Sequence, residues 1–295
     1  MIEHIFFGLG TVNSIKIYDN DSKHYESLLQ DIQKRIEYIS SHCNFYDDKS
    51  DISRINHLAG QDYVTVDNET YKLIREAKAY SLKYKGFFDI TVGPLTSLWH
   101  INTNRDELPS QQDIDQAITK INAQDILLKE DNQIALAHKG QAIDLGSIAK
   151  GYCVDLTKEL LIEAGVKEAI IQYGGSVAVV GKKKKVGIQN PFGSLGDVMG
   201  SIETNACVVT SGTYEHYFIH ENKRYSHLFD LRTGYPIETD MMSLTIVTSS
   251  ALLGDVLTTV YFNGGIIPNN ENVCVIMNDG RYYLSESLRK EFYAR

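Results

Sequence analysis

The sequence predicts an α+β fold, on two observations about the order of its expected helices and strands. Most segments with helical periodicity precede residue 125, and the chain becomes rich in strand-like segments after it. The elements also lack the regular strand–helix–strand rhythm of a parallel sheet. We therefore expect mixed, largely antiparallel sheets with flanking helices, in a single unit over residues 1–295 that contains either one large core or two packed lobes.

Four regular elements are expected in the first 121 residues of the chain. Alternation of apolar and polar residues predicts a strand over residues 11–18, and apolar residues at helical spacing predict a helix over residues 25–39. Asn68 and Ser110 are suitable N-caps for two further helices, which we expect to end near residues 84 and 121.

The segment between these two capped helices is long and aromatic. Residues 87–100 (FFDITVGPLTSLWH) are largely apolar, but Gly93 and Pro94 interrupt them. The pattern is neither a clean helix nor a clean strand, so it predicts a loop. Long, ordered loops of this kind often carry function.

The second half of the chain is expected to consist mainly of strands. Residues 125–137 predict a hairpin, and the apolar run at 169–173 turns at Gly174 and Gly175 into a further strand over residues 176–181. The lysine run at 182–185 is most simply a solvated turn. Two helices interrupt these strands, one beginning near Ser147 and the other near Ser249 and Ser250.

Charge and cysteine content limit the possible partners and the compartment. A net charge of −9 and the lack of a basic stripe argue against nucleic acid, so an anionic substrate would need local cations or backbone N–H groups. There is no CxxC pair, and free buried thiols in a reducing cytosol are expected for Cys43, Cys153, Cys207 and Cys274.

The sequence contains neither a membrane-span pattern nor a leader pattern. Taken as it stands, it predicts a cytoplasmic protein. A chain from which an export or lipoprotein signal had been removed would have the same pattern.

The first candidate for chemistry is the segment AIDLGSIAKGYCVD, residues 142–155. A short strand ends at Asp144, and a glycine turn leads to a helix start near Ser147, whose unpaired N–H groups can face a phosphate. Lys150 lies in the first helical turn and could reach an anion, although a cation there opposes the helix dipole. The alternative is a structural helix that Ser147 caps with its own side chain.

The second candidate is SSALLGDVLTTVYF, residues 249–262. Asp255 and Thr259 are four residues apart and therefore share one face of the expected helix. A carboxylate and a hydroxyl form a hard oxygen pair, and magnesium often completes so sparse a ligand set with water and substrate phosphate. The alternative is a solvated acid beside a core threonine.

The third candidate is YSHLFDLRTGYP, residues 225–236, where a strand carries His227 and Asp230 into a turn. His227 is a candidate general base at neutral pH, and a hydrogen-bonded strand histidine is the alternative. A further strand ends at Ser211 and Gly212, where the backbone could approach a ligand closely. The sequence contains no G-x-S-x-G elbow, HExxH pair or G-x-x-x-x-G-K-[ST] loop.

Taken in order, these segments resemble the ApbE family of flavin transferases. Eight blocks carry the resemblance: LGTVNSI (9–15), FYDDKSDISRIN (45–56), FFDITVGPLTSLW (87–99), IDLGSIAKGYCVD (143–155), IIQYGGSVAVVG (170–181), VVTSGTYEHYF (208–218), HLFDLRTGYP (227–236) and ALLGDVLTT (251–259). Three positions depart from the usual family pattern, namely Leu9 for methionine, Leu231 for proline and Gly254 for alanine. None of the three removes a polar group.

The resemblance implies a T-fold-related enzyme that transfers FMN from FAD to a Thr or Ser hydroxyl of an acceptor flavoprotein with a D-x-x-[ST]-G-[AS]-[ST] motif. It implies a metal, Mg²⁺ or alternatively Ca²⁺, on Asp255, Thr259 and Ser147, the last through its carbonyl. It gives catalytic roles to His227, Asp144 and Lys150. The FAD contacts that it implies are Leu9, Tyr46, Phe88, Asp89, Ile90, Asp144, Lys150, Gly174, Gly175, Ser211, Gly212 and His227.

Two other functions remain open at the level of sequence. The same metal and diphosphate geometry with water as the attacking group would hydrolyse FAD to FMN and AMP. A non-catalytic FAD-binding protein is the third possibility. Intact Asp255, Thr259 and His227 argue against it, because flavin storage needs neither a base nor a metal at the bond that breaks.

Overall fold

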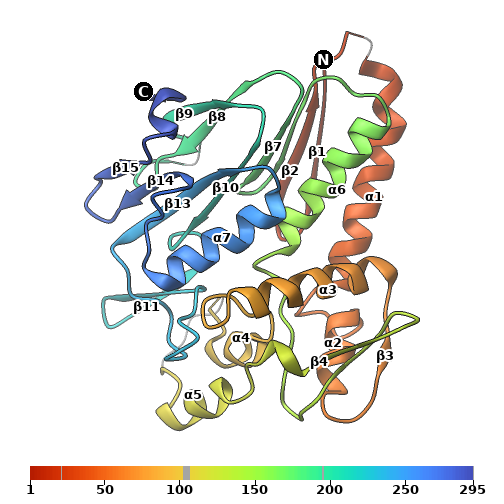
Figure 1. Cartoon of the computed structure of the whole chain (residues 1–295), viewed down its shortest axis with the longest axis vertical. Helices are drawn as coiled ribbons and strands as arrows, with labels where there is room; N and C mark the ends of the chain where they lie inside the picture. Colours follow the sequence, from red (N-terminus) through yellow and green to blue (C-terminus); the bar gives the residue numbers. More distant parts are fainter. Residues whose placement is uncertain (21, 102–106, 195, 295) are drawn as a thin grey trace.

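The largest element of the computed structural model is an eight-stranded antiparallel sheet (Figure 1). The structure describes residues 1–20, 22–101, 107–194 and 196–294. In sheet order the strands are β1 (Ile2–Gly8), β2 (Thr11–Ile17), β6 (Ala169–Tyr173), β7 (Ser176–Val180), β10 (Cys207–Gly212), β13 (Met241–Thr248), β14 (Asn272–Met277) and β15 (Tyr282–Leu284). Every pairing within it is antiparallel, as the sequence predicts.

Three smaller sheets complete the strands of the described residues. One joins β16 (Phe292–Ala294), β9 (Val198–Thr204) and β8 (Lys184–Gln189), and a second joins β3 (Val64–Thr65), β5 (Gln133–Leu136) and β4 (Ile126–Lys129). The third is the hairpin of β11 (Tyr217–His220) and β12 (Lys223–Ser226). The predicted hairpin over residues 125–137 is thus confirmed as β4 and β5.

The helices fall into two groups (Figure 1). α6 (Ala149–Glu163) and α7 (Ala251–Gly264) lie side by side across one face of the large sheet, and α1 (Glu26–His42) lies next to α6. At the other end of the molecule, near the β3–β5 sheet, are α2 (Asp51–His57), α3 (Asn68–Lys83), α4 (Gly93–Trp99) and α5 (Gln111–Ile118). Short 3₁₀ helices are η1 (Ser22–Tyr25), η2 (Ala123–Asp125) and η3 (Leu288–Lys290). None of the helices in the described ranges is long and apolar enough to cross a membrane.

One hydrophobic core connects the two ends of the molecule. Ile36 of α1, Ile52 of α2, Leu73 of α3, Ile246 of β13 and Val256 of α7 are fully buried in the same cluster. The helices α2 and α3 and the large sheet therefore share one hydrophobic core and do not form two separate cores. Smaller clusters lie beneath the β8–β9 strands and around Trp99.

The segment predicted as a loop, residues 87–100, contains a helix. Pro94 lies in the first turn of α4, where no partner is needed for its missing N–H and where its fixed φ suits a helix. The proline that interrupts the apolar sequence pattern is therefore part of the start of α4. Trp99, at the end of α4, is fully buried and donates its indole N–H to the carbonyl oxygen of Gly234 at 2.8 Å. The loop prediction was therefore wrong for residues 93–99.

Three local predictions also differ from the structure. The N-cap of α3 is Asp67, which accepts from the Glu69 backbone N–H, and Asn68 is the first helical residue. α6 begins at Ala149 after Ile148, without a side-chain cap from Ser147. Lys184 and Lys185 belong to strand β8, not to a turn. The predicted cap Ser110 is confirmed, and so is the helix start near Ser249 and Ser250, where the structure has Ser250 as the N-cap of α7. All four cysteines are buried and free, as the sequence predicts.

The junction of α6 and α7 is unusually close. A Cβ added at Gly151 would lie 2.5 Å from the carbonyl oxygen of Ala251, so only glycine lets the two backbones approach this way. The Asp155 carboxylate of α6 accepts from the backbone N–H groups of Ala251 and Leu252 at 2.8 and 2.9 Å, and thereby caps α7. This contact stabilises the first turn of α7.

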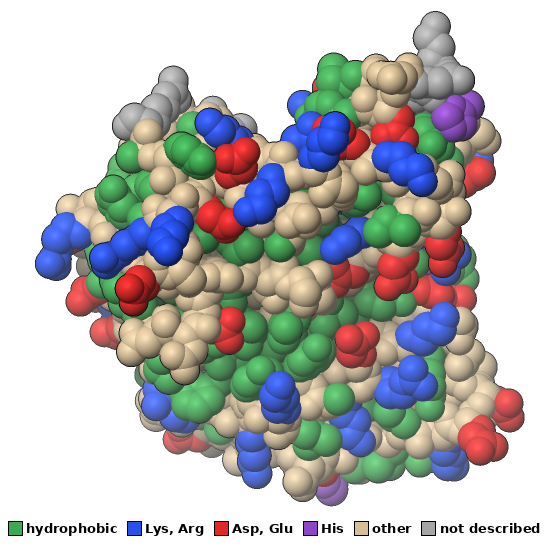
Figure 2. Space-filling model, turned by 45° about the horizontal axis from the view of Figure 1, so that its top comes forward, with side chains coloured by type: hydrophobic (Ala, Val, Ile, Leu, Met, Phe, Trp, Pro, Cys, Tyr) green, Lys and Arg blue, Asp and Glu red, His purple; other side chains and the backbone are tan. Residues whose placement is uncertain are grey.

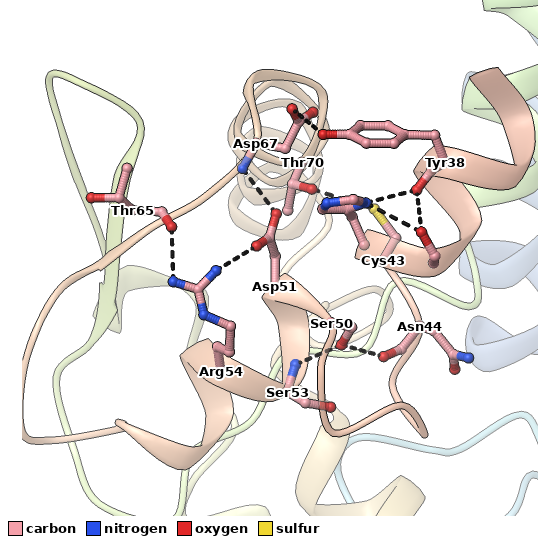
Figure 3. A network of polar contacts seen from close by, with 12 residues as sticks. Tyr38, Cys43, Asn44, Ser50, Asp51, Ser53, Arg54, Thr65, Asp67 and Thr70 are labelled. Atoms are coloured by element: carbon pink, nitrogen blue, oxygen red, sulfur yellow. Dashed lines mark hydrogen bonds and ion pairs between the residues drawn. The ribbon is translucent and has the colours of Figure 1, made fainter. Parts of the chain in front are cut away.

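A polar network ties α1, α2 and α3 together (Figure 3). Asp67 accepts from the Tyr38 hydroxyl at 3.0 Å, and its own backbone N–H donates to Asp51 at 2.9 Å. Asp51 also pairs with Arg54 at 2.9 Å. Burial alone would raise the pKa of Asp67, but the Glu69 backbone N–H and the Tyr38 hydroxyl outweigh it and hold that pKa below its usual value.

We expect the Asp67→Ala variant to lose about 1 kcal/mol of unfolding free energy at neutral pH, the usual cost of removing an N-cap. Because the folded pKa of Asp67 is depressed, its contribution is present above the unfolded pKa and disappears as the pH falls through the folded one. Urea unfolding at pH 7 and in acid below that pKa measures the difference. Equal loss at both pH values would contradict a role for the ionised carboxylate.

Candidate active site

A cavity of about 510 Å³ lies where α4, α6, α7 and the end of β10 meet. Both ends of the molecule contribute to its wall, which fits the common core that joins them. Eleven of the residues predicted from the sequence line it: Leu9, Tyr46, Phe88, Asp89, Asp144, Ser147, Lys150, Ser211, His227, Asp255 and Thr259. Segments that are as much as 250 residues apart in the chain, Leu9 and Thr259, thus meet at one site.

Four of the predicted contact residues do not line this cavity. Ile90 is fully buried, and its carbonyl oxygen accepts from the Asp144 N–H at 2.8 Å, so it positions a wall residue from behind. Gly174 and Gly175 form the β6–β7 turn, and a Cβ on Gly175 would lie 2.7 Å from the Thr210 carbonyl oxygen. Gly212 packs against the Tyr214 ring. These residues support the cavity without facing it.

Asp255 is a buried carboxylate that accepts hydrogen bonds from one residue of α6 and one residue of β7. Oδ2 accepts from the Gly151 N–H at 2.7 Å, and Oδ1 accepts from the Ser176 hydroxyl at 3.0 Å. Burial raises its pKa to about 6, against the opposing effects of the Lys150 charge and these two donors. A carboxylate so placed is stabilised as an anion by any further cation.

Thr259 and Ser147 complete the oxygen set that the sequence predicts for a metal. Thr259 lies one turn after Asp255 on α7 and lines the cavity. Its hydroxyl donates to the Asp255 carbonyl oxygen at 3.0 Å, and a hydroxyl oxygen that donates can still accept or bind a metal through its lone pairs. No cluster of three or more His, Cys, Asp or Glu side chains suited to a metal occurs among the described residues. The buried carboxylate with hydroxyl and carbonyl oxygens nearby fits a hard divalent ion that retains water or substrate ligands.

Asp144 and Lys150 also line the cavity, and they lie three residues before and three residues after Ser147 in the chain. Asp144 accepts from the Gly146 N–H at 2.9 Å and from the Thr96 hydroxyl at 2.8 Å, so its side chain is fixed between α4 and the turn before α6. The Lys150 charge acts on four groups in the cavity: Asp255, Glu215, His216 and His227. Lys150 is therefore the local cation that an acidic protein needs in order to bind an anion.

His227 directly follows β12 and faces the cavity. Its Nδ1 lies 3.2 Å from the backbone carbonyl oxygen of His216, an acceptor only, so Nδ1 carries the proton and Nε2 has a free lone pair. Burial, the neighbouring His216 ring and the Lys150 charge lower the pKa of His227 to about 4. The ring is therefore neutral at pH 7, in the tautomer that a general base requires.

The cavity also contains functional groups that sequence reasoning missed. Glu215 and His216 lie in the turn after β10; burial raises the pKa of the first and lowers that of the second. Both residues are within the block at 208–218, from which the sequence pattern predicted only Ser211 and Gly212 at the end of the expected strand. Asn263 lies on α7 eight residues after Asp255, and helical spacing would have placed it on the face of Asp255 and Thr259.

The molecular surface offers no obvious alternative site for an anionic polymer on the side shown in Figure 2. Lys and Arg side chains are interspersed there with Asp and Glu side chains, and they do not form a continuous basic stripe. This agrees with the net charge of −9.

Comparison with known proteins gives one consistent result. A sequence model of the ApbE family matches residues 9–269. The chain is 34% identical over 260 residues to the FAD:protein FMN transferase of Klebsiella pneumoniae, covering 88% of this chain and 81% of that protein. It is 26% identical to the Treponema pallidum protein of the same name, covering 92% and 80%. The crystal structure of the ApbE protein from Thermotoga maritima superposes with a TM-score of 0.88 at 28% identity, covering 98% of both chains. The chain belongs to the ApbE family.

Proposed function

We propose that the protein is an FAD:protein FMN transferase, which moves FMN from FAD to a Thr or Ser hydroxyl of an acceptor flavoprotein and releases AMP. The relatives that bear this name support the transferase reaction. The observation that carries the proposal is the cavity itself. It brings an oxygen set for a metal, Asp255, Thr259 and Ser147, together with the cation Lys150 and the neutral base His227.

The residues on the α6 side are suited to bind the diphosphate of FAD. Lys150 supplies positive charge in the first turn of α6, where the backbone N–H groups of a helix start also favour an anion. Asp255, Thr259 and the Ser147 carbonyl would hold Mg²⁺, or alternatively Ca²⁺. When bound, such an ion supplies charge neutralisation to a diphosphate under attack. Asp144, fixed by Thr96 and Gly146, orients the turn that carries Ser147.

His227 is suited to accept the proton of the incoming hydroxyl. In the proposed reaction the acceptor oxygen forms a bond to the phosphorus of the FMN phosphate, and the bond from that phosphorus to the oxygen of AMP breaks. The hydroxyl proton goes to Nε2 of His227, and AMP leaves with the bridging oxygen. The product is a phosphoester between FMN and the acceptor side chain.

The isoalloxazine ring of FAD is expected at a different part of the cavity wall from the diphosphate. Leu9, Tyr46 and Phe88 to Ile90 form the region that we assign to the isoalloxazine ring, and of these only Ile90 is behind the wall. The acceptor motif D-x-x-[ST]-G-[AS]-[ST] and a cytoplasmic location are further parts of the proposal.

One experiment separates this function from its alternatives. The protein is incubated with FAD and Mg²⁺, with and without an acceptor domain, while AMP release and the acceptor mass are followed. AMP that appears only with acceptor, together with a flavin adduct, is the expected result. AMP without acceptor would indicate hydrolysis of FAD instead. Tight FAD binding with no AMP in either mixture would contradict the proposal that the protein is an enzyme.

A further inference from the structure

Three apolar side chains of the β1–β2 hairpin are exposed to solvent. Ile5, Phe7 and Val12 are 61%, 69% and 63% exposed, and we call them the β1–β2 patch. Phe7 lies directly opposite Val12 in the strand pairing, and Ile5 lies two residues before Phe7 on the same side of the sheet. The three side chains are therefore neighbours. Single exposed apolar residues are common, but a contiguous group of them is typical of an interaction site.

The patch is the uncovered end of one face of the eight-stranded sheet. On the opposite face of the hairpin, Phe6 is buried in the main core. On the patch side, the strand pairing places Ile5 of β1 on the same face as Val177 of β7. Val177 is buried in the cluster beneath β8 and β9, which cover that part of the face. This cover does not extend to β1 and β2, where the patch side chains stay exposed.

The patch adjoins the opening of the active-site cavity. Leu9 and Gly10, which join β1 to β2, both line the cavity, and Gly10 is also exposed, so this turn lies where the cavity meets the surface. Phe7 and Val12 are each two residues from the turn, and two residues of chain span at most about 7 Å. Tyr46 lines the cavity as well and is 64% exposed. An apolar surface therefore begins at the edge of the cavity.

The proposed reaction requires a large partner at this opening, because the hydroxyl that receives FMN belongs to a protein. A cavity of about 510 Å³ has the size of a site for one small-molecule ligand. With FAD bound, only the acceptor segment that carries the hydroxyl can enter, and the rest of the acceptor must lie against the surface around the opening. Glu3 and Lys16, on the patch side of the hairpin, pair with each other at 3.1 Å. This side therefore suits an apolar partner surface better than a charged one.

We propose that the acceptor flavoprotein docks on the β1–β2 patch through apolar side chains that lie beside its modified Thr or Ser. The inference rests on the proposed function, in that a protein acceptor receives the flavin. Docking on the patch holds the acceptor at the opening while its hydroxyl enters the cavity. The enzyme therefore prefers a folded acceptor to the hydroxyl-bearing segment alone, and because the contact is apolar, this preference depends little on salt concentration.

The test compares two acceptors with the same D-x-x-[ST]-G-[AS]-[ST] motif, a folded flavoprotein domain and a short synthetic peptide. The Phe7→Thr variant removes the largest side chain of the patch and keeps a residue suited to a strand. We expect it to raise the KM for the domain roughly 10-fold, with kcat at saturating domain and the dissociation constant for FAD within about twofold of wild type. The kinetic constants for the peptide should stay unchanged, because the peptide does not reach the patch.

Tyr282→Thr is the matched control. Tyr282 is an aromatic residue, 47% exposed, in β15 at the opposite edge of the same sheet, and it does not line the active-site cavity. Its replacement should leave the KM for both acceptors unchanged, and a rise as large as that in Phe7→Thr would show that the effect is not specific to the patch. Val12→Thr keeps the shape of the side chain and disturbs the exposed strand least. It should raise the KM for the domain by a smaller factor than Phe7→Thr.

Three results would overturn the inference. The first is an unchanged KM for the domain in both Phe7→Thr and Val12→Thr. The second is an equal rise for domain and peptide, which would indicate damage to the cavity. The third is a wild-type dimer, seen in sedimentation, that dissociates in Phe7→Thr while the KM for the domain stays the same, which would assign the patch to a second copy of the chain. In all three cases FMN transfer by wild-type protein would leave the proposed function intact, whereas wild-type protein that attaches FMN to neither acceptor would contradict both.

Discussion

The Asp255→Asn variant is expected to release AMP from FAD roughly 10³-fold more slowly than the wild-type protein. Asp255 is the carboxylate of the proposed metal site, and an amide of the same shape cannot supply its charge. Removing one such electrostatic contribution to a charged transition state typically costs this much. Saturating Mg²⁺ should restore little of the lost rate, and FAD should also bind more weakly. Initial rates measured over a range of Mg²⁺ concentrations test both effects.

Asp155 provides the control for this substitution. Like Asp255 it accepts backbone N–H groups at the α6–α7 junction, but it caps α7 and does not line the cavity. The Asp155→Asn variant should lose stability while its folded fraction retains most of its activity. Undiminished turnover in Asp255→Asn would show that the metal assignment is wrong.

The His227→Gln variant is expected to transfer FMN roughly 10²- to 10⁴-fold more slowly, the range typical for loss of a general base. Glutamine can still donate to the His216 carbonyl oxygen, but it offers no basic nitrogen to the acceptor hydroxyl. FAD binding should change little, because the loss concerns proton transfer rather than the diphosphate contacts. Single-turnover rates and FAD dissociation constants, measured together, separate these two effects.

His216→Gln is the matched comparison. Its backbone carbonyl, which orients His227, is retained, so the rate should fall far less than in His227→Gln. Because His216 contributes to the lowered pKa of His227, its removal should raise that pKa from about 4 toward the usual value. The neutral base is lost as the pH falls through its pKa, so the acid limb of the rate profile assigned to His227 should move to higher pH. An unchanged profile in both variants would argue against His227 as the base.

Several parts of the fold and site were accessible from the sequence because they depend on local patterns. The four-residue spacing of Asp255 and Thr259 places them on one helix face, and α7 confirms it. The cap Ser110 and the start of a helix near Ser249 and Ser250 could also be predicted from local residue chemistry. The order of eight weak blocks, rather than any one of them, indicated the family that the comparisons confirm.

Other parts depend on contacts between distant segments, which no local pattern records. Pro94 interrupts the apolar pattern as a loop residue would, yet it starts α4, which buries Trp99 against residue 234. Gly174 and Gly175 match the family block but support the cavity from outside its wall. The hydrogen bond from Asn263 to the Phe87 carbonyl oxygen joins residues 176 positions apart, and only the structure shows it.

The most direct test of the central claim is the ratio of AMP released to FMN attached, measured in one reaction of wild-type protein with FAD, Mg²⁺ and acceptor. We predict one AMP for each FMN bound to an acceptor hydroxyl, and neither product once a chelator removes the metal. AMP in large excess over attached FMN would show that water is the true nucleophile. Attachment that continues unchanged in chelator would contradict the metal site at Asp255.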